Sequence, residues 1–392
     1  MTNLDRWLLP DGVDEILPEE AQVIEHLRRQ ILDKYHSWGY DLVIPPMIEF
    51  TESLLSGSGR DLDLMTFRVT DQMSGRLMGI RADITPQVAR MDAHSLRADG
   101  PSRFCYSGTV MHTRARGPFE SRTPISIGVE LFGEESLFAD IEVIKLFLKS
   151  LSIAGVEDVY LDLGHVDIVR GLIGQADLSD EQELEVFDLL QRKAISELDA
   201  YIVENIENDE IGGWLKKLPT LTGGIEVLEI ATRMFDTAPN VVQSALEELK
   251  IITHSLTDSG VNIHLDLSEA PGFHYHTGVV FAGYIQGYGK ALGNGGRYDC
   301  VGQAFGRPRP ATGFAFDLKS LVSQGKSSLN LPMGIFVPYS ADPRCQEQAA
   351  LLRAQGYRVI QGFEGQDINM SELKCDRQLI ESAGDYIIKN IT

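Results

Sequence analysis

One stretch of the chain combines side chains that could bind a small polar ligand. Residues 103–133 read as two strands joined by a polar loop, and the second strand alternates at a period of two. Its apolar side chains fall on one face, and the other face carries Ser126, Gly128 and Glu130. These residues can form the floor of a pocket, because the glycine leaves room and the carboxylate accepts hydrogen bonds. A half-exposed hairpin with an incidental glutamate is the alternative interpretation.

A second candidate acid precedes an expected helix. In RADITPQVARMDAH (residues 81–94), Thr85 is expected to cap a helix whose first residue is Pro86. Asp83 would then lie at the exit of a strand, where side chains commonly face a cleft. The alternative is that Asp83 only assists the helix cap.

Two further patterns are typical of ligand sites but lack the context of such sites. His274 and His276 would share one face of a strand and could bind a metal, but no cysteine or converging carboxylate accompanies them. The segment GNGGRYD (293–299) is glycine-rich like a phosphate loop, but it lacks the G-K-[ST] ending and the strand-loop-helix context. We therefore predict no metal and no cofactor, and we interpret the glycine-rich segment as a tight sheet crossing.

The composition argues against nucleic-acid and membrane partners. The 392 residues carry a net charge of −22, which repels a polyanion, and basic residues gather only in small groups such as Arg114, Arg116 and Arg122. The four cysteines show no C-x-x-C spacing, and no apolar run is long enough to span a membrane. We therefore expect a cytoplasmic protein with reduced thiols that binds neither nucleic acid nor a membrane.

The N-terminal elements are expected to place these candidate residues. Residues 17–38 carry apolar side chains at helical spacing, with acids near the start, and predict a long amphipathic helix. Residues 41–50 read as a strand that Pro45 and Pro46 interrupt. Because proline cannot donate to a ladder, this strand belongs at a sheet edge or a subunit boundary. Residues 64–81 predict a hairpin.

The rest of the chain divides into an insertion and a second domain. A helix is expected over 136–156, and an all-helical insertion over about 170–255 interrupts a core domain of residues 1–325. The linker 325–332 then leads into a small α/β domain, residues 331–392, with the order strand, helix, strand, helix, strand. We predict an α+β protein with a central antiparallel sheet and flanking helices.

In this order, the segments resemble the class II aminoacyl-tRNA synthetases, and among them histidyl-tRNA synthetase, over nearly the whole chain. The first helix with GYDLVIPPMIEF resembles the first motif of that class, which builds a dimer interface. The hairpin 103–133 resembles the second motif, and GNGGRYD with ATGFAFDLKSLV resembles the third. HYHTGVVF is similar to the histidine-specific strand. The resemblance implies the fold of that class.

Three departures from the synthetase pattern argue against catalysis. Arginines expected in the second motif, the third motif and the histidine-specific strand are replaced by His112, Ser320 and Pro271. Forming an aminoacyl adenylate places negative charge on a phosphate, and removing one donor to such a charge costs on the order of 10² to 10³ in rate. Three losses leave no basis for adenylation, so we expect no catalytic residues.

The segments RADITPQVARMDAH and GFHYHTGVVF are instead similar to the regulatory subunits of ATP phosphoribosyltransferase. That resemblance implies a non-catalytic subunit of histidine biosynthesis, a histidine-binding homodimer that works in a larger assembly with a short catalytic subunit. It would mediate activation and feedback inhibition of that partner. The amino group of histidine is expected at Asp83 and Thr85, and the imidazole at Glu130. The remaining positions of the implied pocket are Ser126, Tyr275 and His276.

Overall fold

The computed structural model describes residues 7–57, 60–115, 117, 120–269, 275–326, 333–365 and 369–391. By its internal contacts the chain divides into two units, Met1–Ser327 and Ser328–Thr392. None of the helices in the described ranges is both long and apolar enough to cross a membrane.

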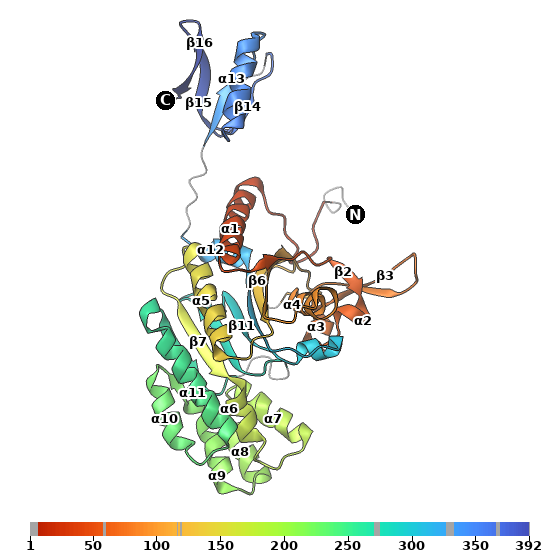
Figure 1. The fold of residues 1–392 in the computed structure, drawn as a ribbon, viewed down its shortest axis with the longest axis vertical. Coiled ribbons are helices and arrows are strands. Elements are labelled where there is room, and N and C mark those ends of the chain that lie inside the picture. The colour runs from red at the N-terminus through yellow and green to blue at the C-terminus, as the bar shows by residue number, and fades with distance from the viewer. Residues whose placement is uncertain are drawn as a thin grey trace. The chain divides into compact units, whose positions relative to one another are not determined.

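The first unit is built on a nine-stranded sheet with the strand order β1-β5-β6-β12-β11-β10-β7-β9-β8 (Figure 1). Its strands are β1 (Asp41–Leu42), β5 (Ser102–Thr109), β6 (Ile125–Phe132), β7 (Tyr160–His165), β8 (Thr222–Gly223), β9 (Asn262–Asp266), β10 (Val279–Tyr284), β11 (Gly293–Arg297) and β12 (Ala311–Asp317). The pairings are antiparallel except β1 with β5 and β7 with β9. The predicted α+β class with a central sheet and flanking helices is confirmed, and the two parallel pairings make the sheet mixed rather than purely antiparallel.

Helices cover one face of this sheet because its strands turn apolar side chains toward them. The covering helices include α1 (Pro18–Ser37), α5 (Leu137–Ile153) and α12 (Leu318–Gln324). Ile127, Val129 and Leu131 of β6 are buried among them, as their alternation predicts. The ring of Phe147 on α5 stacks on Phe316 of β12, with ring centroids 4.6 Å apart. The opposite face of β6 is therefore left for the polar residues.

The helical insertion follows β7 and returns to the sheet at β9. It contains α6 (Val166–Ile173), α7 (Asp180–Gln191), α8 (Ile195–Asn205), α9 (Asp209–Lys217), α10 (Glu226–Met234) and α11 (Asn240–Ser255). The prediction of an all-helical segment is wrong at one point, since β8 pairs with β9 at the sheet edge. This strand has two residues, too short for its pattern to stand out in the sequence.

A second, three-stranded sheet has the order β2-β4-β3. Its strands are β2 (Ile48–Phe50), β3 (Phe67–Thr70) and β4 (Leu77–Ile80). The helices of this part of the chain are α2 (Thr51–Leu54), α3 (Arg60–Met65) and α4 (Thr85–Arg90). The predicted strand over 41–50 is thus two strands in different sheets, separated at Pro45 and Pro46, because neither proline can donate to a ladder. The predicted hairpin is present as β3 and β4, while Leu64 and Met65 belong to α3.

The second unit is a four-stranded sheet, β14-β13-β15-β16, with one helix. Its elements are β13 (Gly334–Val337), α13 (Pro343–Ala354), β14 (Val359–Gln361), β15 (Cys375–Ser382) and β16 (Asp385–Asn390). The helix expected before the last strand is wrong, because that segment forms β15. A two-residue turn joins β15 to β16, and Ala383 and Gly384 both adopt positive φ, at 52° and 89°. Such a turn matches the twist of a hairpin and favours strands on both sides.

Candidate functional site

The register of the central strands places a polar group on the sheet face opposite the helices. Tyr106 of β5 pairs with Gly128 of β6, and Glu130 pairs with Gly313 of β12. Residues opposite each other in an antiparallel pair project on one face, as do alternate residues of a strand. Tyr106, Gly128, Glu130 and Gly313 therefore share this face. Both glycines are tightly packed. A Cβ at Gly128 would collide with Tyr106 Oη, and a Cβ at Gly313 would collide with Glu130 Oε2.

Glu130 is the centre of a buried polar cluster, which we define as Glu130, Thr85, Tyr106 and Tyr298. The Thr85 hydroxyl donates to Glu130 Oε1 at 2.8 Å, and Tyr106 Oη donates to the same oxygen at 3.1 Å. Tyr298 Oη donates to Glu130 Oε2. Glu130 itself is 1% exposed. All three donors are neutral hydroxyls, so no positive charge within the polar cluster balances the carboxylate.

The surroundings of Glu130 favour its protonated form. The pKa of Glu130 is raised to about 8, mainly by burial and in smaller part by the negative charge of Asp83, against the lowering effect of the hydroxyl donors. Burial and the charge of Glu130 also raise the pKa of Tyr106 and Tyr298 well above the ordinary tyrosine value. The tyrosine hydroxyls therefore remain protonated donors. When Glu130 ionises, its carboxylate can accept a hydrogen bond from a cation or an N–H group that a ligand brings.

Asp83 and Thr85 lie at the start of α4, as expected, but the expected cap is wrong. The residue that precedes α4 is Ile84, Thr85 is the first helical residue, and its hydroxyl donates to Glu130 rather than to the helix backbone. Asp83 Oδ1 instead accepts the backbone N–H groups of Ile84 at 2.6 Å and Thr85 at 3.2 Å. Asp83 therefore does assist the helix start, and its charge also acts on Glu130.

Tyr275 contacts the polar cluster through Tyr298, and His276 lies beside Tyr275. The Tyr275 ring stacks on the Tyr298 ring, with centroids 5.1 Å apart and planes inclined by 23°. The His276 ring meets Tyr275 edge-on, at a centroid separation of 5.1 Å. The expected strand through these residues is wrong, because β10 begins only at Val279. They reach the site as irregular backbone that follows the segment 270–274, which is outside the described residues.

Ser126 is on the same face but at a distance from Glu130. It pairs with Gly108 of β5, four residues before Glu130 on β6. The rise of a strand makes that separation about 13 Å. The structure thus brings Asp83, Thr85, Glu130 and Tyr275 together, with His276 beside Tyr275, and leaves Ser126 at the far end of the face.

The structure describes two of the three positions at which the synthetase pattern has an arginine and this chain does not. His112 Nε2 is 3.0 Å from the Ala82 carbonyl oxygen, and the Ser320 hydroxyl donates to Asp317 Oδ2 at 3.1 Å. Pro271 is outside the described residues. The nearby Arg297 is held by Asp140, with Nη2 2.6 Å from the Asp140 carboxylate. Its charge is therefore already balanced.

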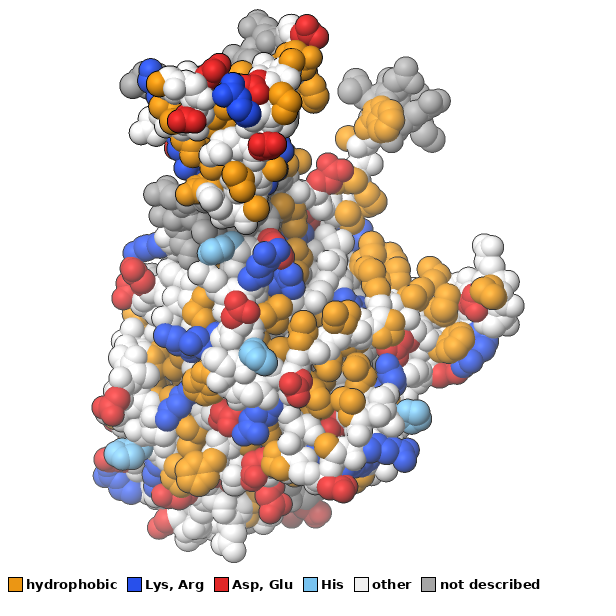
Figure 2. Space-filling view, turned by 45° about the horizontal axis from the view of Figure 1, so that its top comes forward, with side chains coloured by type: hydrophobic (Ala, Val, Ile, Leu, Met, Phe, Trp, Pro, Cys, Tyr) orange, Lys and Arg blue, Asp and Glu red, His pale blue; other side chains and the backbone are white. Residues whose placement is uncertain are grey.

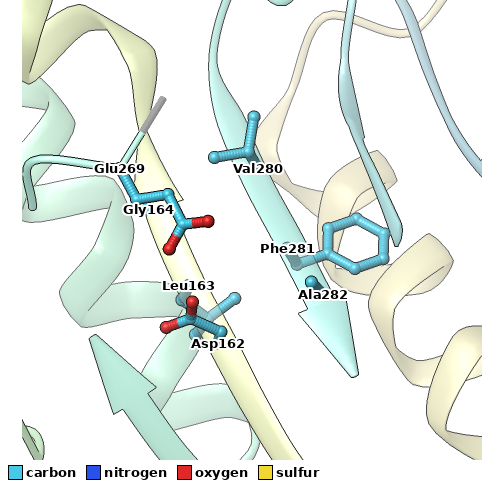
Figure 3. Close-up of a pocket in the computed structure, with 7 residues that line it drawn as sticks. All are labelled: Asp162, Leu163, Gly164, Glu269, Val280, Phe281 and Ala282. Carbon is cyan, nitrogen blue, oxygen red and sulfur yellow. The ribbon is translucent and has the colours of Figure 1, made fainter. Parts of the chain in front are cut away.

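The described residues do not support a metal site, and a small cavity among them is separate from the polar cluster. Within the described ranges, no group of three or more His, Cys, Asp or Glu side chains is arranged to hold a metal ion. His274, one of the two histidines weighed as metal ligands, is outside those ranges. A small cavity does lie between β7 and β10, where the Glu269 carboxylate points toward that of Asp162 (Figure 3). Burial and the Asp162 charge raise the pKa of Glu269 to about 7. This cavity contains none of the expected histidine-binding residues.

Sequence reasoning missed two members of the polar cluster, Tyr106 and Tyr298. Tyr106 had a usable signal, since it follows the same period of two on the first arm of the hairpin. Tyr298 had none, because it directly follows β11 and lies 168 residues from Glu130 in the sequence. The segment GNGGRYD, interpreted as a sheet crossing, therefore also supplies a hydroxyl donor to the site.

Comparisons with known proteins agree with this architecture. The family model described as Histidyl-tRNA synthetase matches residues 12–321. The model described as ATP phosphoribosyltransferase subunit HisZ C-terminal domain matches residues 332–389. Among solved structures, an ATP phosphoribosyltransferase regulatory subunit/histidyl-tRNA synthetase from Bacillus halodurans superposes with a TM-score of 0.83 at 27% identity, covering 94% of this chain and 95% of that chain. Histidyl-tRNA synthetase from a Nostoc species gives 0.80 at 19% identity, covering 98% and 97%, which shows the fold alone.

Curated relatives match over the full length. The ATP phosphoribosyltransferase regulatory subunit of Chromohalobacter salexigens is 50% identical over 391 residues, which cover 99% of each chain. That of Pseudomonas aeruginosa is 51% identical over 390 residues, which cover 98% of each. Together with the match of the second unit, these relatives separate the chain from the synthetases that share its fold. The chain belongs to the family of ATP phosphoribosyltransferase regulatory subunits.

Proposed function

We propose that this chain binds free histidine at the polar cluster and transmits its occupancy to a separate, short catalytic subunit of ATP phosphoribosyltransferase. It thereby mediates activation and feedback inhibition at the first step of histidine biosynthesis. The observation that carries the proposal is the buried Glu130 carboxylate, which is held by three neutral hydroxyls and balanced by no cation of the polar cluster. An imidazole N–H is the same kind of donor and can replace one of these hydroxyls.

The neighbours of Glu130 support an amino acid rather than a simple imidazole. Asp83 lies close enough to raise the pKa of Glu130, and its Oδ1 alone accepts the backbone N–H groups at the start of α4. Asp83 Oδ2 is therefore available to an ammonium group. The stacked rings of Tyr275 and Tyr298 supply a flat apolar wall beside the polar cluster, against which an imidazole can pack.

The proposed role is regulatory and not catalytic. The side chains of His112 and Ser320 interact with the protein itself, at the Ala82 carbonyl and the Asp317 carboxylate. Neither is a guanidinium that could stabilise a phosphate in an adenylation reaction. Histidine-dependent exchange of pyrophosphate into ATP should therefore be absent from the purified chain. Detecting exchange above background, in a preparation free of host synthetase, would contradict this part of the proposal.

The binding site is tested by calorimetry with variants that keep side-chain size. Glu130→Gln and Asp83→Asn should each weaken histidine binding by about 1.5 to 3 kcal/mol, the range for a hydrogen bond to a charged group. Glu269→Gln is a matched control, because Glu269 is another glutamate with a raised pKa, only partly buried, and lies in the separate cavity near β7. It should leave histidine affinity unchanged. Unchanged affinity in both site variants would mean that histidine binds elsewhere.

The partnership is tested by mixing the purified chain with a short catalytic subunit. A stable complex should form, and turnover should rise relative to the catalytic subunit alone and fall when histidine is added. If the complex forms but the Glu130→Gln variant is inhibited at the same histidine concentration as the wild type, the inhibitory site is on the catalytic partner. The chain would then be an activator that does not sense histidine.

A further inference from the structure

Buried charges in the described part of the first unit mostly pair with opposite charges. Arg309 is 2.8 Å from Asp92, Arg297 is 2.6 Å from Asp140, and Lys193 contacts Asp266. Arg81 and Glu130 are exceptions, because each is buried and neither forms an ion pair in the ranges that the structure describes. A buried charge without a partner is costly. Arg81 carries such a charge, and Glu130 acquires one when it ionises, so a single ligand that contacts both would offset both costs.

Backbone carbonyl oxygens hold Arg81 through Nε and Nη1, and these two contacts do not use Nη2. Its Nε donates to the Thr109 carbonyl at 3.0 Å and its Nη1 to the Pro45 carbonyl at 2.8 Å. Arg81 is 7% exposed. Its Nη2 lies over Gly108, where a Cβ would collide with it. The acid with the largest effect on its charge, Glu49, is itself held by Arg90 at 2.8 Å.

Arg81 and Glu130 lie at opposite ends of the same sheet face. Gly108, beneath Arg81, follows Tyr106 by two residues on β5 and pairs with Ser126 of β6. Both therefore share the face that carries Glu130. The four residues from Ser126 to Glu130 span about 13 Å, so one small molecule with a hydrogen bond at each end can contact both Arg81 and Glu130. The segment 81–85 runs between them, since Thr85 contacts Glu130.

We propose that Arg81 binds the carboxylate of the amino acid whose imidazole lies against Glu130. The proposal rests on the proposed function and names the residue that recognises the third group of the ligand. A carboxylate that enters beside Asp83 and Glu130 meets two acids, so it needs a cation to bind at all. Among the described residues, Arg81 is a buried guanidinium on this sheet face that forms no ion pair, and its Nη2 takes no part in the two backbone contacts. A guanidinium also suits a carboxylate geometrically.

The order of groups along the segment 81–85 supports this assignment. Arg81, Asp83 and Thr85 are two residues apart in turn, so a cation, an acid and a hydroxyl follow one another beside the sheet. The carboxylate and the amino group of an amino acid share one carbon, and its side chain extends from that carbon. The same sequence of groups in the ligand, carboxylate, ammonium and imidazole, matches the three positions and ends at Glu130.

A purely structural role for Arg81 predicts something different. Through Nε and Nη1 it ties residue 45 to residue 109, and losing those contacts would loosen the whole site. Every ligand would then lose affinity by a similar factor. Carboxylate recognition instead changes the ratio between ligands that do and do not carry the carboxylate. The ratio is therefore the informative quantity.

The test is calorimetric titration of the full chain with L-histidine and with L-histidinol, in which a hydroxymethyl group replaces the carboxylate. The wild type should bind histidine about 10- to 100-fold more tightly, the effect of one charge-assisted hydrogen bond. Arg81→Gln should reduce this ratio to near one, and Arg81→Lys should keep part of it. Arg122→Gln is the matched control, because Arg122 also holds backbone carbonyls, those of His112 and Asp11, each at 3.0 Å. It should leave the ratio unchanged.

Each outcome decides the proposal. If the wild type binds histidine and histidinol equally, the proposal is overturned without any variant, whereas the proposed histidine site stands. If Arg81→Gln and Arg81→Lys weaken both ligands by the same factor, Arg81 is only structural and the proposal is again overturned. If Arg81→Gln fails to fold, the wild-type ratio and the Arg81→Lys ratio decide. Failure of the wild type to bind histidine at all would instead overturn the proposed function.

Discussion

Gly313 lies directly opposite Glu130 in the pairing of β12 with β6, so close that a Cβ at Gly313 would collide with Glu130 Oε2 and with the Val129 carbonyl oxygen. Gly313→Ala should therefore push the carboxylate away from its hydroxyl donors. Overpacking of this kind costs about 1 to 3 kcal/mol of stability. We expect histidine affinity, measured by calorimetry, to fall at least as much as in Glu130→Gln.

A second glycine provides the control for this substitution. Gly213 is in α9, and a Cβ there would meet no atom within 4 Å. Gly213→Ala should raise the free energy of unfolding by about 0.5 to 1 kcal/mol, because alanine favours a helix interior. Histidine binding should not change. Wild-type affinity in Gly313→Ala would show that the position of Glu130 is not important for the ligand.

The raised pKa of Glu130 predicts a pH-dependent stability. Its pKa is about 8 in the folded chain and 4.5 in an exposed glutamate, so between these values the folded state binds more protons than the unfolded state. Stability from this group is complete below about pH 4.5 and is lost as the pH rises toward 8. The slope is at most about 1.4 kcal/mol per pH unit.

Glu130→Gln isolates this contribution, because glutamine keeps the shape of the side chain and cannot ionise. Urea unfolding of both proteins between about pH 5 and 9 should show the variant gaining stability relative to the wild type as the pH rises. Other buried acids, such as Glu269, contribute equally to both proteins and cancel in the difference. Parallel pH profiles would mean that Glu130 is already ionised in the folded chain.

The polar cluster shows what sequence patterns can and cannot predict. The period of two on β6 identified the face of Glu130, and helical spacing identified α1, because both patterns are local. The contact of Glu130 with Tyr298 depends on the register of three strands, which no local pattern encodes. The proposed role of Arg81 could not be predicted for the same reason, because it depends on the absence of an ion pair with any described acid, which only the three-dimensional structure shows. At β15, a turn through Ala383 lacked the Asn-Gly or Asp-Gly signal that usually identifies a hairpin.

The exposed apolar surface near the proline-separated strands predicts a dimer. Ile44 is 81% exposed, and Leu42, Met47 and Ile48 are also exposed beside it in sequence. Figure 2 shows further hydrophobic side chains on the side of the first unit that carries β3 and β4, where Val69, Met73 and Leu77 are exposed. Such a surface is typical of a subunit interface. We therefore predict that a second copy of the chain covers it.

Ile44→Glu should shift the chain from dimer to monomer in sedimentation equilibrium, because a charge at a two-fold interface is buried twice without a partner. The control is Val203→Glu on α8 of the insertion, where valine is 72% exposed and an added acid should leave the mass unchanged. A wild-type chain that is monomeric at micromolar concentration would contradict the prediction before any variant is made.

Histidine at Glu130 is predicted to act on a catalytic partner by favouring one of two states of the complex. A ligand shifts an equilibrium only by its differential affinity for the two states, so inhibition through this chain requires that histidine prefer the inhibited arrangement of the complex. Linkage then makes the effect reciprocal. Substrates of the catalytic subunit should weaken histidine binding by the same factor by which histidine weakens substrate binding.

The measurement is the histidine affinity of the assembled complex with and without those substrates, set beside the substrate affinity with and without histidine. The two factors should agree, and both should move toward one in a complex that carries Glu130→Gln, because the ligand no longer distinguishes the states. Glu269→Gln, with its carboxyl in the separate cavity, should retain the wild-type coupling. If the coupling persists unchanged in the Glu130→Gln complex, histidine acts through a site on the partner, and the polar cluster of this chain has no part in the inhibition.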